Sequence, residues 1–380
     1  MKHLSTFACI VLLATTLHAS STPAISQVFT FFCNQSFTSC PDGFDPAVGP
    51  IQLSNGFLYG TTWWAGQGSA NAGGTVFATS ISGKTKVLHT FEPGPNGKFL
   101  NGENPAIAFV KGTDGNFYGV TESGGANSFG VFYKITPTGA FQVLYNFCSL
   151  SGCPDGPGKI ILGFDGSFYG VTTNVVFRLT PQGAWSSIYT LTSTDGTAQT
   201  LIQGVDGNFY GTAIYGLEAG RIFQVTPSGQ FTILYTLQQF KNITTSLVQA
   251  SDGNFYGGTS YGTVFQFTPA GQFTDIATLT AAEGPTPTFL LQASDGNLWG
   301  LSQNGGTAPD RPGTVFAVST TGTVLTSAEF SCASTGCKPE QMTQGADGEF
   351  YGVAIMGGKA TSNPLGTLFK IDAALTTRVK

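Results

Sequence analysis

One short phrase of aspartate, glycine and aromatic residues recurs along the whole chain and limits the folds it can adopt. Its clearest copy, residues 252–257, reads D-G-N-F-Y-G. An aromatic residue followed by glycine marks each of seven copies: Tyr59-Gly60, Tyr118-Gly119, Tyr169-Gly170, Tyr210-Gly211, Tyr256-Gly257, Trp299-Gly300 and Tyr351-Gly352. The glycines of successive copies lie 41 to 59 residues apart. This period fits four-stranded propeller blades and is too long for ankyrin or leucine-rich repeats.

Each repeat is predicted to contain four short strands. In residues 246–280, a D-G turn joins a first strand to a second at 254–259, and a P-x-G turn joins a third strand at 262–268 to a fourth at 273–279. Further third strands are expected at 130–136, 175–180, 220–226, 313–319 and 366–372. No long segment has apolar residues at helical spacing, so the fold is predicted to be all-β.

Seven such units predict a seven-bladed β-propeller of four-stranded antiparallel blades, in which length adds repeats and does not enlarge one core. A ring needs a closing strand. Residues 27–32 resemble a fourth strand that precedes the first full repeat, and the last repeat ends soon after its third strand. We expect the N-terminal strand to complete the last blade, either as its outer strand or beside the C-terminal residues. Residues 20–380 are thus predicted to be one propeller domain, with repeats from about 47 to 380.

The first 19 residues have the features of a secretory signal peptide. Lys2 and His3 precede an apolar stretch at 7–17, and Ala19 supplies a small residue for cleavage, with Ala24 as an alternative. The stretch is too short to span a membrane, and no second one follows. We expect a secreted or periplasmic protein without a membrane span in the mature chain.

Six cysteines form three close pairs, each directly after a strand-like run. The pairs are Cys33/Cys40, Cys148/Cys153 and Cys332/Cys337. Their even number, close spacing and exported context favour disulfides that close short loops. Metal binding is the alternative, but no pair has a second pair or a histidine nearby in sequence to complete four ligands. We therefore expect no metal site and no cofactor, although a divalent ion in the central channel stays open.

Charge and histidine content exclude several functions. The net charge is −5, with 16 Lys and Arg against 21 Asp and Glu, so the chain has no basic surface for nucleic acid. His89 is the single histidine after the predicted signal peptide. That leaves no histidine-based metal cluster and little room for a Ser-His-Asp relay. We expect a monomer.

The aspartates of the D-G turns are interpreted as structural. They recur at one turn position in six repeats, which favours capping of the backbone over calcium binding or catalysis. They are Asp114, Asp165, Asp206, Asp252, Asp295 and Asp347. The aromatic-glycine steps are likewise interpreted as packing between blades.

The phrases D-G-N-F-Y-G-V-T, G-V-F-Y-K-I-T-P-T-G and V-L-Y-N-F in residues 114–147 resemble the bacterial GloVer repeat, a choice-of-anchor tandem-repeat family of β-propellers. Residues 295–300 also resemble the repeats of two-component-regulator propellers. Both resemblances imply a propeller, and neither implies an activity. Members of the first family often carry a sorting or anchoring segment. The chain ends without an apolar tail, so release into the periplasm or medium is expected.

Strand parity predicts which face carries function. Turns after the first and third strands share one face and are uniformly short, whereas those after the second and fourth strands lie on the opposite face and are long and varied. Variable loops on one face of a scaffold commonly form binding sites. The candidate ligand-binding residues there are Trp63, Trp64, Asn101, Glu103, Glu122, Asp310 and Arg311, with Asp42, Asp45 and Asp155 beside cysteines.

Three functions are compatible with these residues. The first is a binding propeller for a carbohydrate or protein ligand, in which Trp63 and Trp64 stack on a sugar or grip an apolar group. The alternative for this pair is that one tryptophan covers a blade edge and the other is incidentally exposed. The second function is a polysaccharide hydrolase or lyase with two carboxylates at the channel mouth, Glu103 and Glu122 being the first pair to inspect. The third is a purely structural extracellular module.

Overall fold

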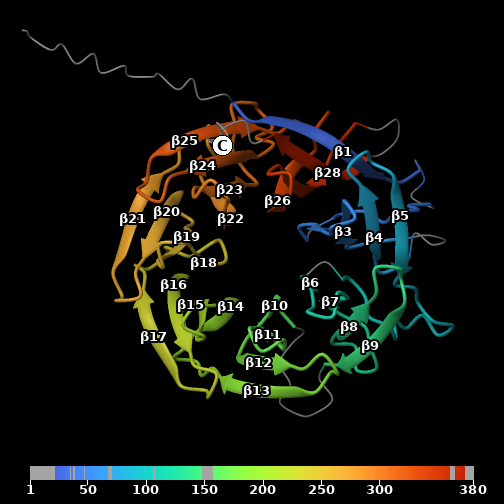
Figure 1. Cartoon of the computed structure of the whole chain (residues 1–380), viewed down its shortest axis with the longest axis horizontal. Coiled ribbons are helices and arrows are strands. Elements are labelled where there is room, and N and C mark those ends of the chain that lie inside the picture. The colour runs from blue at the N-terminus through green and yellow to red at the C-terminus, as the bar shows by residue number, and fades with distance from the viewer. Residues whose placement is uncertain are drawn as a thin grey trace, which may run out of the picture.

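The computed structural model describes residues 22–34, 36, 39–46, 48–66, 71–105, 108–147, 157–359 and 364–372. These residues form seven four-stranded antiparallel sheets, which are arranged in a ring around a central axis (Figure 1). The seven-bladed β-propeller predicted from the repeat is confirmed. The described residues contain no helix of the length and apolar character needed to cross a membrane.

The blades follow one another in chain order, and each runs from an innermost to an outermost strand (Figure 1). Blade 1 contains β2 (Ile51–Gln52), β3 (Phe57–Thr62), β4 (Thr75–Ser80) and β5 (Thr85–Thr90). Blade 2 contains β6 (Ala108–Lys111), β7 (Phe117–Val120), β8 (Val131–Ile135) and β9 (Phe141–Asn146). Blade 3 contains β10 (Ile160–Leu162), β11 (Phe168–Val171), β12 (Val175–Leu179) and β13 (Trp185–Thr190). Blade 4 contains β14 (Thr197–Gln203), β15 (Phe209–Tyr215), β16 (Ala219–Val225) and β17 (Phe231–Thr236).

The remaining three blades keep this order, except that the last takes its outer strand from the N-terminus. Blade 5 contains β18 (Val248–Gln249), β19 (Phe255–Gly258), β20 (Thr263–Phe267) and β21 (Phe273–Thr278). Blade 6 contains β22 (Pro287–Gln292), β23 (Leu298–Ser302), β24 (Thr314–Val318) and β25 (Val324–Glu329). Blade 7 contains β26 (Cys337–Gln344), β27 (Phe350–Met356), β28 (Pro364–Asp372) and β1 (Ala24–Phe32).

The N-terminal strand closes the ring, as predicted. β1 pairs antiparallel with β28, from Ala24 opposite Asp372 to Phe32 opposite Pro364. Phe31 is fully buried, and its ring contacts that of Phe77 in blade 1 at a centroid distance of 5.1 Å. Of the two arrangements open from sequence, the structure adopts the one in which β1 is the outer strand.

The aromatic-glycine steps pack the blades. A side chain at Gly257 would meet the ring of Phe265 on the neighbouring strand, because its Cβ would lie 2.5 Å from that ring. Glycine is therefore required where the third-strand aromatic residue crosses the second strand. The aromatic residue before the glycine packs against the next blade, as Tyr210 does against Phe255 at 4.3 Å.

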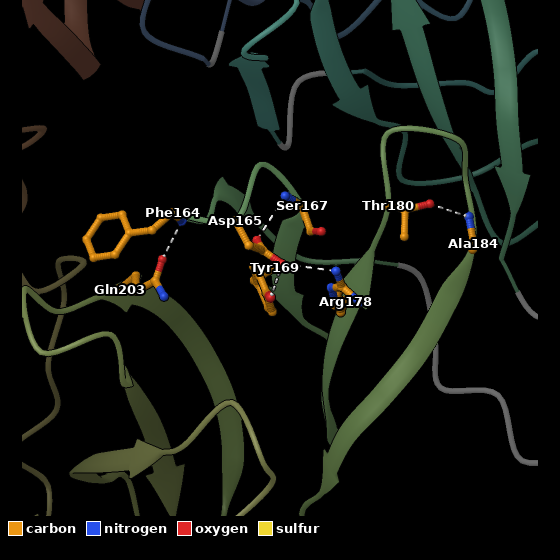
Figure 2. A network of polar contacts seen from close by, with 8 residues as sticks. All are labelled: Phe164, Asp165, Ser167, Tyr169, Arg178, Thr180, Ala184 and Gln203. Atoms are coloured by element: carbon orange, nitrogen blue, oxygen red, sulfur yellow. Dashed lines mark hydrogen bonds and ion pairs between the residues drawn. The ribbon is translucent and has the colours of Figure 1, made fainter.

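The turn aspartates hold the backbone, as interpreted from sequence. In blade 3, Asp165 accepts hydrogen bonds from the Ser167 amide at 3.0 Å and from the Tyr169 hydroxyl at 3.0 Å, and Arg178 adds a third contact (Figure 2). Asp114, Asp206, Asp252 and Asp347 accept the same pair of bonds, and Asp295 receives its second bond from the indole of Trp299. These carboxylates are occupied by local structure.

A series of glutamines, which we call the glutamine belt, joins neighbouring blades on the face of the D-G turns. Each lies at the end of an innermost strand and accepts a hydrogen bond from a backbone amide in the preceding blade: Gln52, Gln203, Gln249, Gln292 and Gln344. Figure 2 shows the Gln203 bond to the Phe164 amide. The last four also donate to the glycine carbonyl of their own D-G turn, at 2.9 to 3.0 Å.

Disulfides close two of the three predicted cysteine loops, Cys33–Cys40 and Cys332–Cys337. Cys148 and Cys153 lie outside the described residues. The antiparallel order of every blade places these loops on one face with the other long connections, and we call it the long-loop face.

Candidate ligand-binding site at the long-loop end of the axis

The chain enters three of the blades through a strained residue followed by proline. Asp45, Asn104 and Lys338 have φ values of 60°, 61° and 57°, a conformation uncommon for residues other than glycine. The amide of each donates to a carbonyl of the preceding blade, that of Leu365, Gly73 or Pro312 respectively, at 2.7 to 3.1 Å. These residues therefore fix how the chain enters blades 1, 2 and 7 on the long-loop face.

Three charged groups from different blades influence one another electrostatically, and we call them the axial cluster: Asp45, Lys159 and Glu340. Lys159 directly precedes β10 in blade 3, whereas Glu340 lies on β26 in blade 7. These blades are not neighbours in the ring, yet Lys159 and Glu340 interact electrostatically, and Glu340 also interacts with Asp45. The cluster therefore links charges at the inner edges of blades 3 and 7.

The environment of the axial cluster shifts the pKa values toward neutrality. Burial raises the pKa of the Glu340 carboxyl to about 7, with Asp45 adding to the shift and Lys159 opposing it. Burial also raises the pKa of Asp45, and of Asp42 nearby in sequence. Lys159 is accessible to water but enclosed by the surrounding blades, and this loss of bulk solvation lowers its pKa, while Glu340 opposes the shift.

Glu340 is positioned as well as desolvated. The side-chain amide of Gln303, just after β23 in blade 6, donates a hydrogen bond to its Oε1. With a pKa near 7, Glu340 exists in both the acid and the carboxylate form at neutral pH. It can thus donate to a ligand, accept from it, or transfer a proton. Perturbed titratable groups of this kind concentrate at functional sites.

The two predicted tryptophans differ in their surroundings. Trp63 is half-buried and packs against the hydrophobic cluster between blades 1 and 2, and its amide donates to the Asp45 carbonyl at 3.0 Å. Trp64 is 40% exposed, with its ring centroid 6.4 Å from that of Trp63 and tilted by 50°. Trp64 therefore presents an aromatic surface on the long-loop face, next in sequence to the residue that contacts Asp45.

The predicted carboxylate pair is held by two separate contacts. Glu103 accepts a hydrogen bond from the Ser123 hydroxyl at 3.0 Å. Glu122 accepts one from the side-chain amide of Asn104 at 3.4 Å. Neither contact directs the two carboxylates toward a shared partner. The other predicted residues, Asn101, Asp310 and Arg311, are exposed on loops of the same face, and Asp155 lies outside the described residues.

Sequence reasoning missed Lys159, Gln303 and Glu340. A usable signal was present, because only 10% of the residues are charged, and Glu340 lies within an innermost strand. A charged side chain at that position must face the axis or the core, so it indicates a functional site, whereas a charge on an exposed loop does not. In the described part of the chain, no group of three or more histidine, cysteine, aspartate and glutamate side chains is placed to bind a metal ion.

Known structures share this architecture at low sequence identity. The structure of a streptogramin B lyase aligns with a TM-score of 0.63 and 16% identity, over 92% of this chain and 98% of that one. Virginiamycin B lyase from Staphylococcus aureus aligns with a TM-score of 0.62 and 14% identity, over 92% of this chain and 99% of that one. The extracellular domain of a protein described as a hybrid two component system from B. thetaiotaomicron gives 0.60 and 11%, over 87% of this chain and 40% of that one.

The sequence comparisons identify the repeat itself. No curated protein has a matching sequence. The family model of the Gloeobacter/Verrucomicrobia repeat matches residues 21–175 and 259–380, which is more than half of the chain. Five of the seven aromatic-glycine steps lie within the matched residues, and the chain belongs to the Gloeobacter/Verrucomicrobia repeat family.

Proposed function

We propose that this protein is an exported propeller that binds a carbohydrate ligand at the long-loop end of its axis. The observation that carries the proposal is the axial cluster, in which Glu340 and Lys159 from non-adjacent blades interact across the axis and both have pKa values shifted by desolvation. A scaffold that keeps such groups partly desolvated at one end of the ring has a ready set of polar contacts for a ligand.

The chemistry of the cluster favours a ligand rich in hydroxyl groups. Lys159 can donate hydrogen bonds to a ligand, and Asp45 can accept them. Glu340, with a pKa of about 7, can donate or accept a hydrogen bond near neutral pH. Hydroxyl groups also both donate and accept. The exposed ring of Trp64 adds an apolar surface of the type that packs against sugar rings.

A glycan array tests the proposal. We expect the wild-type protein to bind a subset of cell-envelope or extracellular glycans, and Glu340→Gln and Lys159→Met to weaken that binding at least about tenfold, the loss of one charge-assisted contact. Lys86→Met is the control, because Lys86 is exposed on the outermost strand of blade 1. Absence of glycan binding, or equal binding by all four proteins, would reject the site.

Export is part of the proposal. Two disulfides among the described residues fit a protein that folds in an oxidising compartment, and residues 1–19 have a signal-like pattern. Expression in a bacterial host followed by N-terminal sequencing of the exported protein should show a new terminus after Ala19 or Ala24. Full-length protein found only in the cytoplasm would contradict it.

The shifted pKa of Glu340 favours a second candidate, an acid–base enzyme acting on a polysaccharide. A virginiamycin B lyase with this fold is described as catalytically inactive when a histidine is replaced by alanine. Here, the described residues contain one histidine, His89, on the outermost strand β5 of blade 1. Glu340 would therefore have to supply the proton transfer. Turnover of a polysaccharide that Glu340→Gln abolishes while binding persists would favour the enzyme over the binding protein.

A further inference from the structure

The glutamine belt is interrupted at two junctions: Lys111 takes the glutamine position between blades 1 and 2, and an apolar residue takes it between blades 2 and 3. At four complete junctions a glutamine carboxamide accepts from a backbone amide of the preceding blade and donates to a glycine carbonyl of its own D-G turn, as Gln203 does with Phe164 and Gly207 at 2.8 and 2.9 Å. Seven residues before the repeat tyrosine, blade 3 has Leu162 in place of glutamine.

Leu162 leaves both backbone groups of this junction without a carboxamide. By the pattern of the belt, these groups are the amide of Thr113 in blade 2 and the carbonyl of Gly166 in blade 3. Neither has a hydrogen-bond partner in the part of the chain that the structure describes. The Leu162 side chain instead packs against the hydrophobic cluster of blades 2 and 3. The two turns still lie close together, since a Cβ on Gly166 would be 3.7 Å from the Thr113 hydroxyl.

The free groups border a hollow of about 490 Å³, a volume typical of small-molecule sites. Its lining includes Thr113 and Gly166 together with a charged pair, Lys134 and Asp114, whose Nζ and Oδ2 atoms are 2.8 Å apart. The side chains of Gln142 and Gln182 add polar groups. The hollow lies on the face of the D-G turns, opposite the axial cluster.

We propose that this hollow is a second ligand site, which binds a small amino acid with a primary carboxamide, of the glutamine type. The carboxamide takes the place that a belt glutamine occupies elsewhere: its oxygen accepts from the Thr113 amide, and its nitrogen donates to the Gly166 carbonyl. The carboxylate of the amino acid lies toward the ammonium of Lys134, whose Asp114 partner is already held by Asn116 and Tyr118. The four glutamines that make both contacts elsewhere in the belt are the precedent for the recognition.

Calorimetric titration of the intact protein with L-glutamine and L-glutamate tests the proposal. The two ligands have nearly the same shape, but a carboxylate cannot donate to the Gly166 carbonyl. We expect millimolar binding of glutamine and at least about tenfold weaker binding of glutamate. No heat with millimolar glutamine, or equal affinity for both ligands, would overturn the proposal.

Two substitutions locate the site. Leu162→Gln should restore the missing link, abolish glutamine binding and raise the melting temperature by about 1–3 °C, whereas Leu162→Ile should retain binding. If Leu162→Gln fails to fold, Lys134→Met provides the second variant, and about tenfold weaker glutamine binding is expected. Retained binding in a folded Leu162→Gln protein contradicts the proposal.

Glu340→Gln tests the other end of the ring. Loss of glutamine binding in this variant would assign the ligand to the axial cluster instead.

Discussion

Tyr133 carries a hydroxyl that its position does not require. It lies on the third strand of blade 2 over Gly119, where a Cβ would be 2.3 Å from the hydroxyl oxygen. The corresponding residues of the other blades are Phe77, Phe177, Phe223, Phe265, Phe316 and Phe369. Tyr133 is fully buried, its hydroxyl has no partner among the described residues, and burial raises its pKa. We therefore expect Tyr133→Phe to increase the free energy of unfolding by about 1–2 kcal/mol.

Urea unfolding of the variant measures this effect. Tyr118→Phe is the matched control, because the Tyr118 hydroxyl donates to Asp114 at 3.0 Å and its removal should destabilise by about 1 kcal/mol. A Tyr133→Phe protein that is less stable than the wild type would show that the hydroxyl has a partner after all, such as a bound water.

His89 makes stability depend on pH. Its ring stacks on Phe141 of the neighbouring blade at a centroid distance of 3.9 Å, and its Nε2 is buried without a partner among the described residues. Burial lowers its pKa to about 4. An unfolded histidine binds a proton below about pH 6.5, whereas the folded one remains neutral down to about 4. Its contribution to stability is therefore complete above pH 6.5 and falls as the pH is lowered, by at most about 3 kcal/mol.

His89→Phe removes this titration and keeps an aromatic ring for the stack. Tyr189 and Tyr235 stack on Phe231 and Phe273 in the same way, so a neutral ring fits the position. Urea unfolding of both proteins at about pH 7.5 and about pH 4.5 should show the variant gaining stability relative to the wild type at the lower pH. The comparison between proteins cancels the titration of carboxylates common to both. An equal difference at the two pH values would assign no role to His89.

The glutamine belt is an element of stability that can be tested by copying its natural interruption. In Gln249→Leu, the Val205 amide and the Gly253 carbonyl lose bonds of 2.8 and 3.0 Å. We expect a loss of about 1–2 kcal/mol in the free energy of unfolding. Gln272→Leu, at an exposed turn position, is the control and should change little. Equal stability of both variants would mean that water satisfies the two backbone groups as well as the carboxamide does.

The elements of this fold could be predicted from sequence because the local pattern is repeated seven times. The third strand expected at 262–268 is observed as β20 at Thr263–Phe267, and the closing strand expected at 27–32 is observed as β1 at Ala24–Phe32. The belt could not be predicted in the same way. Its glutamines end short innermost strands beside polar turns, where a glutamine in the sequence looks like an ordinary solvent-exposed residue, and the amides that bond to them belong to other blades.

The candidate site was even harder to predict from sequence than the belt. The sequence predicts a role for Trp63 and Trp64 together because they are adjacent in one loop, whereas the structure shows one half-buried ring and one exposed ring. Lys159 and Glu340 are 181 positions apart in the sequence, and only closure of the ring brings blades 3 and 7 to face each other. A site assembled across an axis has no spacing signal, so the prediction from sequence is limited to the face that carries it.

Closure also determines the stability of the molecule as a whole. Without β1, the β28 edge loses its partner, and the cluster around Leu368 loses Val28 and Phe29. Because each blade buries its faces only against its neighbours, an unclosed ring exposes two such faces.

We expect a protein that starts at Cys33 to lose cooperative unfolding. Phe31→Ala leaves the strand in place and should lower the free energy of unfolding by about 3–5 kcal/mol. A synthetic peptide of residues 22–32 added to the truncated protein should restore a cooperative melting transition, and a peptide with Phe31→Ala should restore it less well. If the truncated protein melts like the wild type without any peptide, the seven blades hold together through their faces alone, and β1 is an addition to a ring that is already closed.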